Sequence, residues 1–536
     1  MRQPPFRLMY EGEWNDIVCV DYPLTKERLL EEDMQPLLNT QVDAFTCNLC
    51  SSDGYCCELE NGELLARSVE KFDNAWAWRY RENVKKLVEA GANPPEIATE
   101  YGHRYGMKVF PVVRMNDPHD QYLFARFELS DFKRNHPEYL IGEDVDWERY
   151  WIAGGESSPP GKYQPGTMDS ITWGLFDYAH EAVRAHKLAI IEEFITRWDN
   201  DGMMLDFERE SRCFRDGTDP QNQQLMTDLV RQVRATLDEV AAQRGTEQYL
   251  IVRVLADIDE TIRRGLDIRR WVEEDLVQVI VPGAGYAPLT LQVQPWLELA
   301  AGHDCWVFAG SNHWRPLEET RAWALTMRRT GAHGVYLFNW GHLLWGHPAG
   351  TIPQADRTGT VWYDEVHPDY YQVLHEIGDV RTMEYSNKRY VLDSIPHERS
   401  GGEAGKLHRE YRAIDDVVLP VTMSVGTHEV NFQFGDDLPA AQQRGLDPCV
   451  TLRMKVNNYT EPDEFSVKIN GTALDNEART TRAEFIMNDD TWVEYPIPPQ
   501  ALEVGENLLQ IAVASLNPQM AVPPVLTNVE IVVEYS

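Results

Sequence analysis

The chain has 536 residues and a formal net charge of −36 at pH 7, and 43% of its residues are hydrophobic. This length predicts about two or three domains, and the composition is that of a packed globular protein rather than a disordered chain. The charge excludes most nucleic-acid binders and most proteins that adhere to anionic membranes, because phosphate groups attract a cationic surface.

The N-terminus and the cysteines add two expectations. There is no apolar run of about 18 residues, and no apolar signal region follows the start of the chain, so we expect a cytoplasmic protein; a chain already trimmed of a leader would look the same. Four of the eight cysteines lie within eleven residues: Cys47, Cys50, Cys56 and Cys57. Their spacing is not a standard zinc pattern and no His flanks it, which favours buried thiols over a metal site.

Up to about residue 375, apolar strand-like runs alternate with helical patterns, and this rhythm predicts βα units around a parallel sheet. Eight strand candidates are the number that a (β/α)8 barrel needs. They are Asp16–Asp21, Val42–Leu49, Lys108–Arg114, Gly202–Glu208, Tyr249–Leu255, Val277–Pro282, Cys305–Gly310 and Gly334–Asn339. Helices are expected over Arg79–Glu100, Ala179–Trp198, Gln221–Gln243 and Leu317–Thr330.

From Val417 onward apolar and polar residues alternate and turn signals recur, which is typical of a β-sandwich. Its strand candidates are Val418–Val425, Val450–Val456, Glu464–Ile469, Leu508–Ala514 and Val529–Tyr535. We therefore expect an α/β (β/α)8 TIM barrel over residues 1–378, a linker or bridging segment over 379–416 and an all-β sandwich over 417–536. The sandwich would bind carbohydrate, brace the barrel or mediate homo-oligomers.

The stretch Gly202–Glu208 predicts a buried strand that ends on two acids. Side chains alternate along a strand, so Asp206 and Glu208 face the same way. In a parallel barrel the carboxyl ends of the strands form the active face, and a carboxylate pair is the equipment for cleaving glycosidic bonds. Glu208 lies further up the strand and is the better candidate for the general acid. The spacing of about 6.6 Å between residues i and i+2 fits either retention or inversion of configuration.

Polar and aromatic residues also end the other strands. Arginines there would hold sugar hydroxyls or keep Asp206 ionised, although an ion pair of Arg114 with Asp206 can be purely structural. Indole rings at the rim would stack on pyranose rings. The predicted substrate-binding residues are Arg114, Asn116, His119, Arg253, Asp257, His313, Trp314, Asn339 and Trp340. No cofactor is implied, and the spacing of Asp117, Asp120 and Asp257 does not support a divalent cation.

Four stretches resemble the bacterial "family 10-like" glycosyl hydrolase-like barrel proteins: Gly106–Asp120, Phe132–Leu140, Asp201–Arg209 and Gly331–Asn339. The resemblance covers most of the first ~375 residues and implies a (β/α)8 barrel that acts on carbohydrate. Related sequences read Asp-Phe-Met-Arg where this chain has Asp206-Phe207-Glu208-Arg209. The family pattern therefore favours Asp206 over Glu208 as the essential acid.

A partial likeness to chitinase-type barrels lies on the fourth strand, which reads D-G-x-D-x-D-x-E in that family. Asp201, Gly202, Asp206 and Glu208 fit this pattern, but Met204 replaces the middle Asp, and the sixth strand lacks the M-x-Y-D motif. The favoured function is hydrolysis of a glycosidic bond in an oligo- or polysaccharide, with no nucleic-acid or membrane partner. The alternatives are a non-catalytic glycan-binding barrel, a chitinase-type substrate-assisted hydrolase and a polysaccharide lyase.

Overall fold

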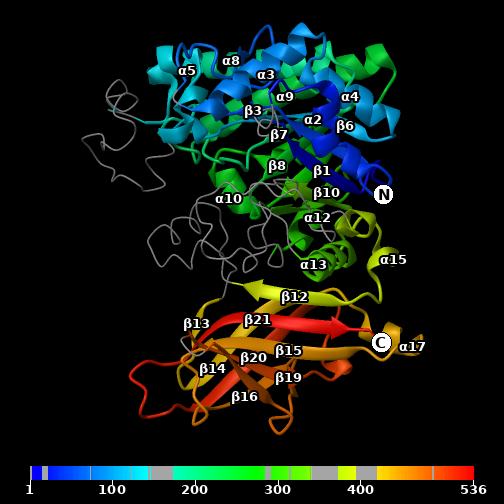
Figure 1. Cartoon of the computed structure of the whole chain (residues 1–536), viewed down its shortest axis with the longest axis vertical. Coiled ribbons are helices and arrows are strands. Elements are labelled where there is room, and N and C mark those ends of the chain that lie inside the picture. Colours follow the sequence, from blue (N-terminus) through cyan, green and yellow to red (C-terminus); the bar gives the residue numbers. More distant parts are fainter. Residues whose placement is uncertain are drawn as a thin grey trace.

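A computed structural model gives the fold, and it describes residues 3–14, 22–72, 74–121, 123–142, 145, 173–283, 291–312, 316–338, 340, 372–393, 419–485 and 488–535. Two units are stacked along the long axis of the molecule. In Figure 1 the barrel, coloured blue to green, occupies the upper part and the β-sandwich, coloured yellow to red, the lower part. A search of the described helices finds none with the length and apolar character of a membrane span.

The first unit is a closed barrel of parallel strands in the order β1-β11-β10-β9-β8-β7-β6-β2. This confirms the predicted (β/α)8 barrel. Its strands are β1 (Leu8–Glu13), β2 (Ala44–Asn48), β6 (Lys108–Arg114), β7 (Gly202–Asp206), β8 (Tyr249–Val254), β9 (Val279–Pro282), β10 (Trp306–Asn312) and β11 (Gly334–Phe338). A small sheet after β2 is built from β3 (Cys50–Ser51), β4 (Gly54–Tyr55) and β5 (Glu63–Leu64).

The first barrel strand differs from the sequence prediction. The expected strand Asp16–Asp21 lies outside the described residues, and the strand that closes the barrel is β1, Leu8–Glu13, which pairs with both β11 and β2. Two acids, Glu11 and Glu13, occupy inward positions of β1, so the run does not read as an apolar strand. The other barrel strands overlap the predicted ones and differ from them only at the ends.

Helices surround the barrel, and two helices stand where the sequence predicted a single long one. The segment expected to form one helix over Arg79–Glu100 is two helices, because Gly91 adopts a positive φ of 74° and Pro94 begins a new helix. The α-helices are α2 (Lys26–Asp33), α3 (Ala75–Glu89), α4 (Pro94–Arg104), α5 (Asp131–Asn135), α8 (Glu181–Arg197), α9 (Pro220–Arg244), α10 (Ile258–Arg263), α11 (Ile268–Glu273), α12 (Gln294–Ala300), α13 (Leu317–Arg329), α15 (Val380–Met383) and α17 (Leu438–Gln443).

Strand alternation divides the barrel side chains into two cores. Leu8, Leu205 and Val252 belong to the large core between strands and helices. Met9, Met204 and Ile251 belong to a separate cluster inside the barrel. The next inward positions toward the carboxyl ends of these strands are no longer apolar, and this change from apolar to charged residues positions the site.

The second unit has two antiparallel sheets, which confirms the predicted C-terminal β fold. One sheet has the order β12-β21-β15-β19-β18 with β13 beside β21, and the other has the order β14-β20-β16-β17. Strand β12 comes from the segment expected to be a linker. The strands are β12 (Lys388–Asp393), β13 (Val421–Thr422), β14 (Gly426–Phe434), β15 (Cys449–Asn457), β16 (Glu464–Ile469), β17 (Thr472–Ala473), β18 (Thr480–Phe485), β19 (Asn488–Pro496), β20 (Gly505–Ser515) and β21 (Val525–Glu534).

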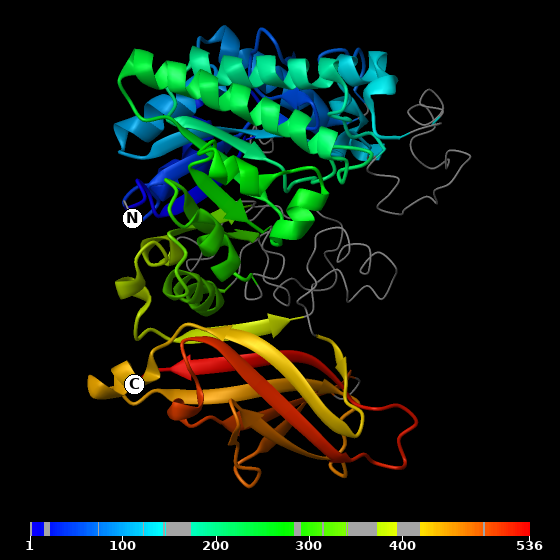
Figure 2. The same ribbon diagram turned by 180° about the vertical axis from the view of Figure 1, so that it is seen from behind.

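The sandwich docks on helix α13 of the barrel. Ala322 of α13 is buried within the hydrophobic core of the sandwich, and Gly435 lies directly against the backbone of Thr326. Polar contacts tie the same surfaces together: Arg329 donates to the carbonyl of Gly435 at 3.0 Å, and Arg389 of β12 pairs with Glu319 at 2.6 Å. Figure 2 shows β12 and β21 running beneath the barrel from the opposite side.

Candidate active site

Charged side chains fill the carboxyl end of the barrel interior. By strand alternation the inward positions beyond the apolar layer are Glu11 and Glu13 on β1, Arg114 on β6, Asp206 on β7 and Arg253 on β8. These five residues, together with Asp117 and Glu208 in the loops that follow β6 and β7, are called the acid–arginine cluster below. All seven are at most 6% exposed, so their charges interact in a site shielded from bulk water.

Arg253 joins the two acids that the sequence singled out. Its Nη1 donates to Oδ2 of Asp206 at 2.9 Å, and its Nη2 donates to Oε2 of Glu208 at 2.5 Å. The other carboxylate oxygen of Asp206 accepts the backbone N–H groups of Glu208 at 2.9 Å and Arg209 at 3.0 Å. The two carboxylates outweigh the cost of burial and raise the pKa of Arg253. The predicted pairing of Arg253 with Asp206 is therefore present.

Arg114 forms a second, separate set of ion pairs. Its Nη2 donates to both carboxylate oxygens of Glu13, at 2.6 and 2.9 Å, and its Nη1 donates to Asp117 at 3.1 Å. Asn48 donates to the same Glu13 carboxylate at 2.8 Å. Burial opposes the charge of Arg114, but Glu13 and Asp117 outweigh burial and raise its pKa. Arg114 is thus held inside the barrel by Glu13 and Asp117 rather than by Asp206, the partner considered from the sequence.

Glu11 differs from the other acids of the cluster. One of its oxygens accepts a hydrogen bond from the hydroxyl of Tyr336, and the other, Oε1, is buried without a hydrogen-bond partner in the described part of the chain. Burial raises the pKa of Glu11 well above its usual value, and the charge of Glu13 raises it further. Arg253 and Arg114 lower the pKa of Glu11 but do not cancel this rise, so the shift favours the protonated form of Glu11, beside carboxylates that are paired with arginine.

Aromatic rings lie beside both guanidinium groups. The guanidinium carbon of Arg253 lies 3.7 Å from the ring centre of Phe338 and 5.9 Å from that of Tyr336. The guanidinium carbon of Arg114 lies 6.0 Å from the ring centre of Phe338. Both rings come from β11, whose inward side is aromatic where that of β1 is acidic.

His119, which contacts both Asp117 and Arg209, extends the cluster toward the rim of the barrel. His119 Nδ1 lies 2.5 Å from Oδ1 of Asp117, and Arg209 Nη2 donates to His119 Nε2 at 2.9 Å. Burial of Asp117 is outweighed by His119 and Arg209, which lower its pKa well below the usual range. The side chain of His119 is 26% exposed, so this predicted residue stands where the buried cluster meets solvent.

Three other predicted residues, Asn116, Asp257 and Trp340, lie outside the acid–arginine cluster. Asn116 is buried and uses its side-chain amide to bind the backbone of Phe176 and Arg212. Asp257 is exposed and caps the N-terminus of α10 by accepting the N–H of Glu260 at 2.7 Å. Trp340 was expected at the rim as a stacking platform, but it is 0% exposed and belongs to the core between strands and helices. The expectation was wrong because inward alternation ends with β11 at Phe338.

The remaining predicted residues, His313, Trp314 and Asn339, lie outside the described residues. The residues that the sequence reading missed are Glu11, Glu13, Tyr336 and Phe338. The alternation Met9, Glu11, Glu13 along one face of β1 is the sequence signal for the two acids. The first strand was predicted at Asp16–Asp21 instead, so this alternation was not assigned to a strand.

The acids considered for a cation are not assembled for that purpose. Asp117 pairs with Arg114, Asp120 pairs with Lys133 at 2.8 Å and Asp257 caps a helix. Within the described ranges no group of three or more His, Cys, Asp or Glu side chains could hold a metal ion. Cys47, Cys50, Cys56 and Cys57 are buried thiols, and burial raises the pKa of Cys50 to about 12.

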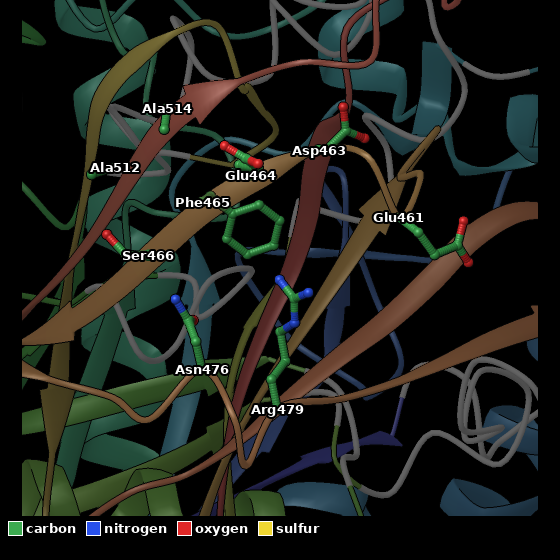
Figure 3. Close-up of a pocket in the computed structure, with 9 residues that line it drawn as sticks. All are labelled: Glu461, Asp463, Glu464, Phe465, Ser466, Asn476, Arg479, Ala512 and Ala514. Atoms are coloured by element: carbon green, nitrogen blue, oxygen red, sulfur yellow. The ribbon is translucent and has the colours of Figure 1, made fainter.

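A cavity of about 390 Å³ lies in the sandwich, away from the acid–arginine cluster. Figure 3 shows Arg479 and Asn476 on one side of it, near the ring of Phe465, with Glu461 on another. Arg479 lies over the Phe465 ring at 5.5 Å. The buried carboxylate of Asp463 is satisfied by the N–H and hydroxyl of Thr460 and by the N–H of Asn517, so it fixes loops rather than awaiting a ligand.

No protein-family model matches the chain, and no curated protein matches it. Solved structures do match, at low identity. A maltogenic α-amylase from Thermotoga neapolitana is 10% identical, with 95% of this chain and 99% of that one covered and a TM-score of 0.37. The PgaB glycoside hydrolase domain from Bordetella bronchiseptica is 10% identical over 62% of this chain and 94% of its own, with a TM-score of 0.35.

A class V chitinase from Pseudomonas fluorescens Pf-5 is 10% identical over 69% of this chain and 98% of its own, with a TM-score of 0.33. TM-scores of this size carry no argument about activity. The fold rests on the closed ring of strands, and the site rests on its own residues. Together they define a (β/α)8 barrel protein with paired acids and arginines at the carboxyl end of its strands.

Proposed function

We propose that this protein hydrolyses glycosidic bonds in an oligo- or polysaccharide, with Asp206 and Glu208 as its anionic centre. The observation that carries the proposal is the pair of carboxylates at the carboxyl end of β7, both fixed by Arg253. Such a pair is suited to an oxocarbenium-like transition state, because fixed negative charge stabilises the positive charge that develops on the sugar. The motif resemblance to the family 10-like glycosyl hydrolase-like barrels supports the same function.

Unsatisfied polar atoms support a polyhydroxyl ligand. Nε of Arg114, Nε of Arg253 and Oε1 of Glu11 are buried, and none has a hydrogen-bond partner among the described residues. A buried polar atom without a partner costs about 1–3 kcal/mol, which a ligand that forms a hydrogen bond with it would recover. A sugar carries hydroxyl groups that both donate and accept hydrogen bonds, so it could satisfy all three atoms, the two guanidinium N–H groups and Oε1 of Glu11.

The ion pairs weigh against the lyase alternative. A lyase acting on uronic-acid polymers needs a cation to bind the substrate carboxylate. Arg114 is occupied by Glu13 and Asp117, and Arg253 is occupied by Asp206 and Glu208. Four protein carboxylates already bind these two guanidinium groups, so they would repel a substrate carboxylate that entered the cluster.

One observation favours a second candidate, a barrel that binds glycan without cleaving it. Both oxygens of Asp206 are engaged inside the protein, by Arg253 and by two backbone N–H groups. A carboxylate bound in this way orders the loop after β7 whether or not any bond is broken. Binding without turnover would follow from such an arrangement.

Turnover on a panel of aryl glycosides and polysaccharides tests the proposal. Asp206→Asn and Glu208→Gln should each lower kcat/KM by about 10²–10⁴-fold, the range for loss of a positioned catalytic carboxyl group. Asp436→Asn is the matched control, because Asp436 is also buried and paired with a cation, Lys388 at 2.9 Å, but belongs to the sandwich. Glycan binding by calorimetry with no turnover on any substrate would instead establish the second candidate.

A further inference from the structure

The number of cations in the cluster leaves one carboxyl group without an ion pair. Arg253 binds Asp206 and Glu208, and Arg114 binds Glu13 and Asp117. Both terminal nitrogens of each guanidinium are used in these contacts. Glu11 therefore faces the interior with no cation within ion-pair distance in the described chain, and its single hydrogen-bond partner there is an uncharged phenol, that of Tyr336.

The position of Glu11 complements that of the acid pair. In the closed ring of strands, β1 lies across the barrel from β7 and β8. Glu11 follows Met9 on the inward face of β1, as Asp206 follows Met204 on β7 and Arg253 follows Ile251 on β8. A sugar bound at the carboxyl end of the barrel interior would thus have an ion-paired carboxylate on one side and a carboxyl group without an ion pair among the described residues on the other.

We propose that Glu11 is the proton donor of this site and that Tyr336 positions it. This inference rests on the proposed function. The Glu11 O–H proton passes to the glycosidic oxygen as the bond between that oxygen and the anomeric carbon breaks, and the electron pair of that bond stays on the departing oxygen. The oxygen of one water then bonds to the anomeric carbon, and its released proton restores the carboxyl group of Glu11. One water is consumed and the protein regains its starting protonation.

Two further observations support this division of roles. Burial and the charges of Glu13 and Asp206 raise the pKa of Glu11 and outweigh the opposing charges of Arg253 and Arg114, so the shift favours the protonated form that a proton donor needs. Glu208, the general-acid candidate from the sequence, instead lies 2.5 Å from a guanidinium nitrogen of Arg253. An ion-paired carboxylate is suited to stabilise charge or accept a proton rather than to donate one.

Leaving-group dependence tests the proposal on the full-length chain. With the sugar found in the substrate panel, Glu11→Gln should lower kcat/KM by about 10²–10⁴-fold on alkyl glycosides, whose leaving oxygen needs a proton. Its kcat/KM on dinitrophenyl glycosides, whose leaving group departs as a stable anion, should fall less than about 10-fold. The alkaline limb of the wild-type pH profile, where Glu11 loses its proton, should vanish in Glu11→Gln and shift in Tyr336→Phe.

Glu13→Gln is the matched comparison, since Glu13 lies two residues along on the same face of β1 but is paired with Arg114. Its losses should be equal on both kinds of leaving group. Equal losses in Glu11→Gln, or an unchanged alkaline limb in both Glu11→Gln and Tyr336→Phe, would overturn the role of Glu11 while leaving hydrolysis intact. A wild-type chain that cleaves no glycoside of either kind would overturn the proposed function, and the role of Glu11 with it.

Discussion

Asp33 makes the stability of the barrel depend on pH. It ends helix α2, it is 4% exposed, and it accepts the indole N–H of Trp14 at 2.7 Å. Burial raises the pKa of Asp33 to about 7, whereas an aspartate in an unfolded chain titrates near 3.9. Between these two values the unfolded chain releases a proton that the folded chain keeps, so the free energy of unfolding should fall as pH rises from about 4 to about 7.

Asp33→Asn should remove this dependence, because an amide has a similar shape, can accept the Trp14 N–H and does not titrate. We expect the variant to gain stability over the wild type as pH rises, by up to about 4 kcal/mol at pH 8, since one pKa unit corresponds to about 1.4 kcal/mol. Urea unfolding at pH 5 and pH 8 measures the difference. Parallel pH profiles for the two chains would show that Asp33 ionises in the folded state as it does when unfolded.

At the level of single residues, sequence reasoning succeeded where the strand position alone decides the environment. The facing of Asp206, Arg114 and Arg253 follows from alternation along strands whose bounds were predicted closely. It could not say which arginine pairs with which acid, because that depends on contacts across the barrel. Nor could the sequence predict the raised pKa of Glu11, which arises from burial and from the nearby charge of Glu13.

At the level of elements, the packing of β7 against β8 depends on Gly202. This residue begins β7 opposite Tyr249, with a φ of 146°, and a Cβ atom there would lie 2.0 Å from the carbonyl oxygen of Tyr249. Gly202→Ala must therefore separate two barrel strands or distort them. We expect a loss of about 3–5 kcal/mol in the free energy of unfolding, from backbone strain and overpacking together.

Gly245→Ala provides the control for this prediction. Gly245 also has a positive φ, 68°, but a Cβ atom there would meet no heavy atom within 4 Å, because the residue ends helix α9 at the surface. Its cost should be about 1–2 kcal/mol, the cost of a left-handed conformation alone. Equal losses for the two variants in denaturant unfolding would show that strand separation does not contribute at Gly202.

Elements with a continuous apolar run or a strict alternation of apolar and polar residues were predicted closely, and elements whose pattern is interrupted by charges were not. Strand β6 was predicted with its observed bounds, Lys108–Arg114, and so was β16, Glu464–Ile469. Strand β1 was missed because Glu11 and Glu13 interrupt its apolar pattern. Strand β12 was assigned to a linker because half of its six residues, Lys388–Asp393, are charged. Both strands gain their stability from neighbours distant in sequence, which local pattern cannot reveal.

For the molecule as a whole, helix α13 makes the barrel and the sandwich depend on one another. The helix lies between β11 and β12, and one of its residues, Ala322, is part of the sandwich core while others, such as Trp323, are part of the barrel core. Shared burial of one helix couples the unfolding of the two units, because the helix cannot lose one set of contacts without weakening the other. We expect a single calorimetric transition for the wild-type chain.

Gly435→Ala should uncouple the two units. A Cβ atom at Gly435 would lie 2.7 Å from the backbone nitrogen and 2.9 Å from the Cα atom of Thr326, so the sandwich must shift away from α13 at a cost of about 1–3 kcal/mol. Differential scanning calorimetry should then resolve two transitions. Gly426→Ala, at the other end of β14, is the control: it places a Cβ atom in open space at a φ of 137°, so it should lower the stability of the sandwich without splitting the transition. A single transition in Gly435→Ala at the wild-type temperature would mean that the contact with α13 does not couple the barrel to the sandwich.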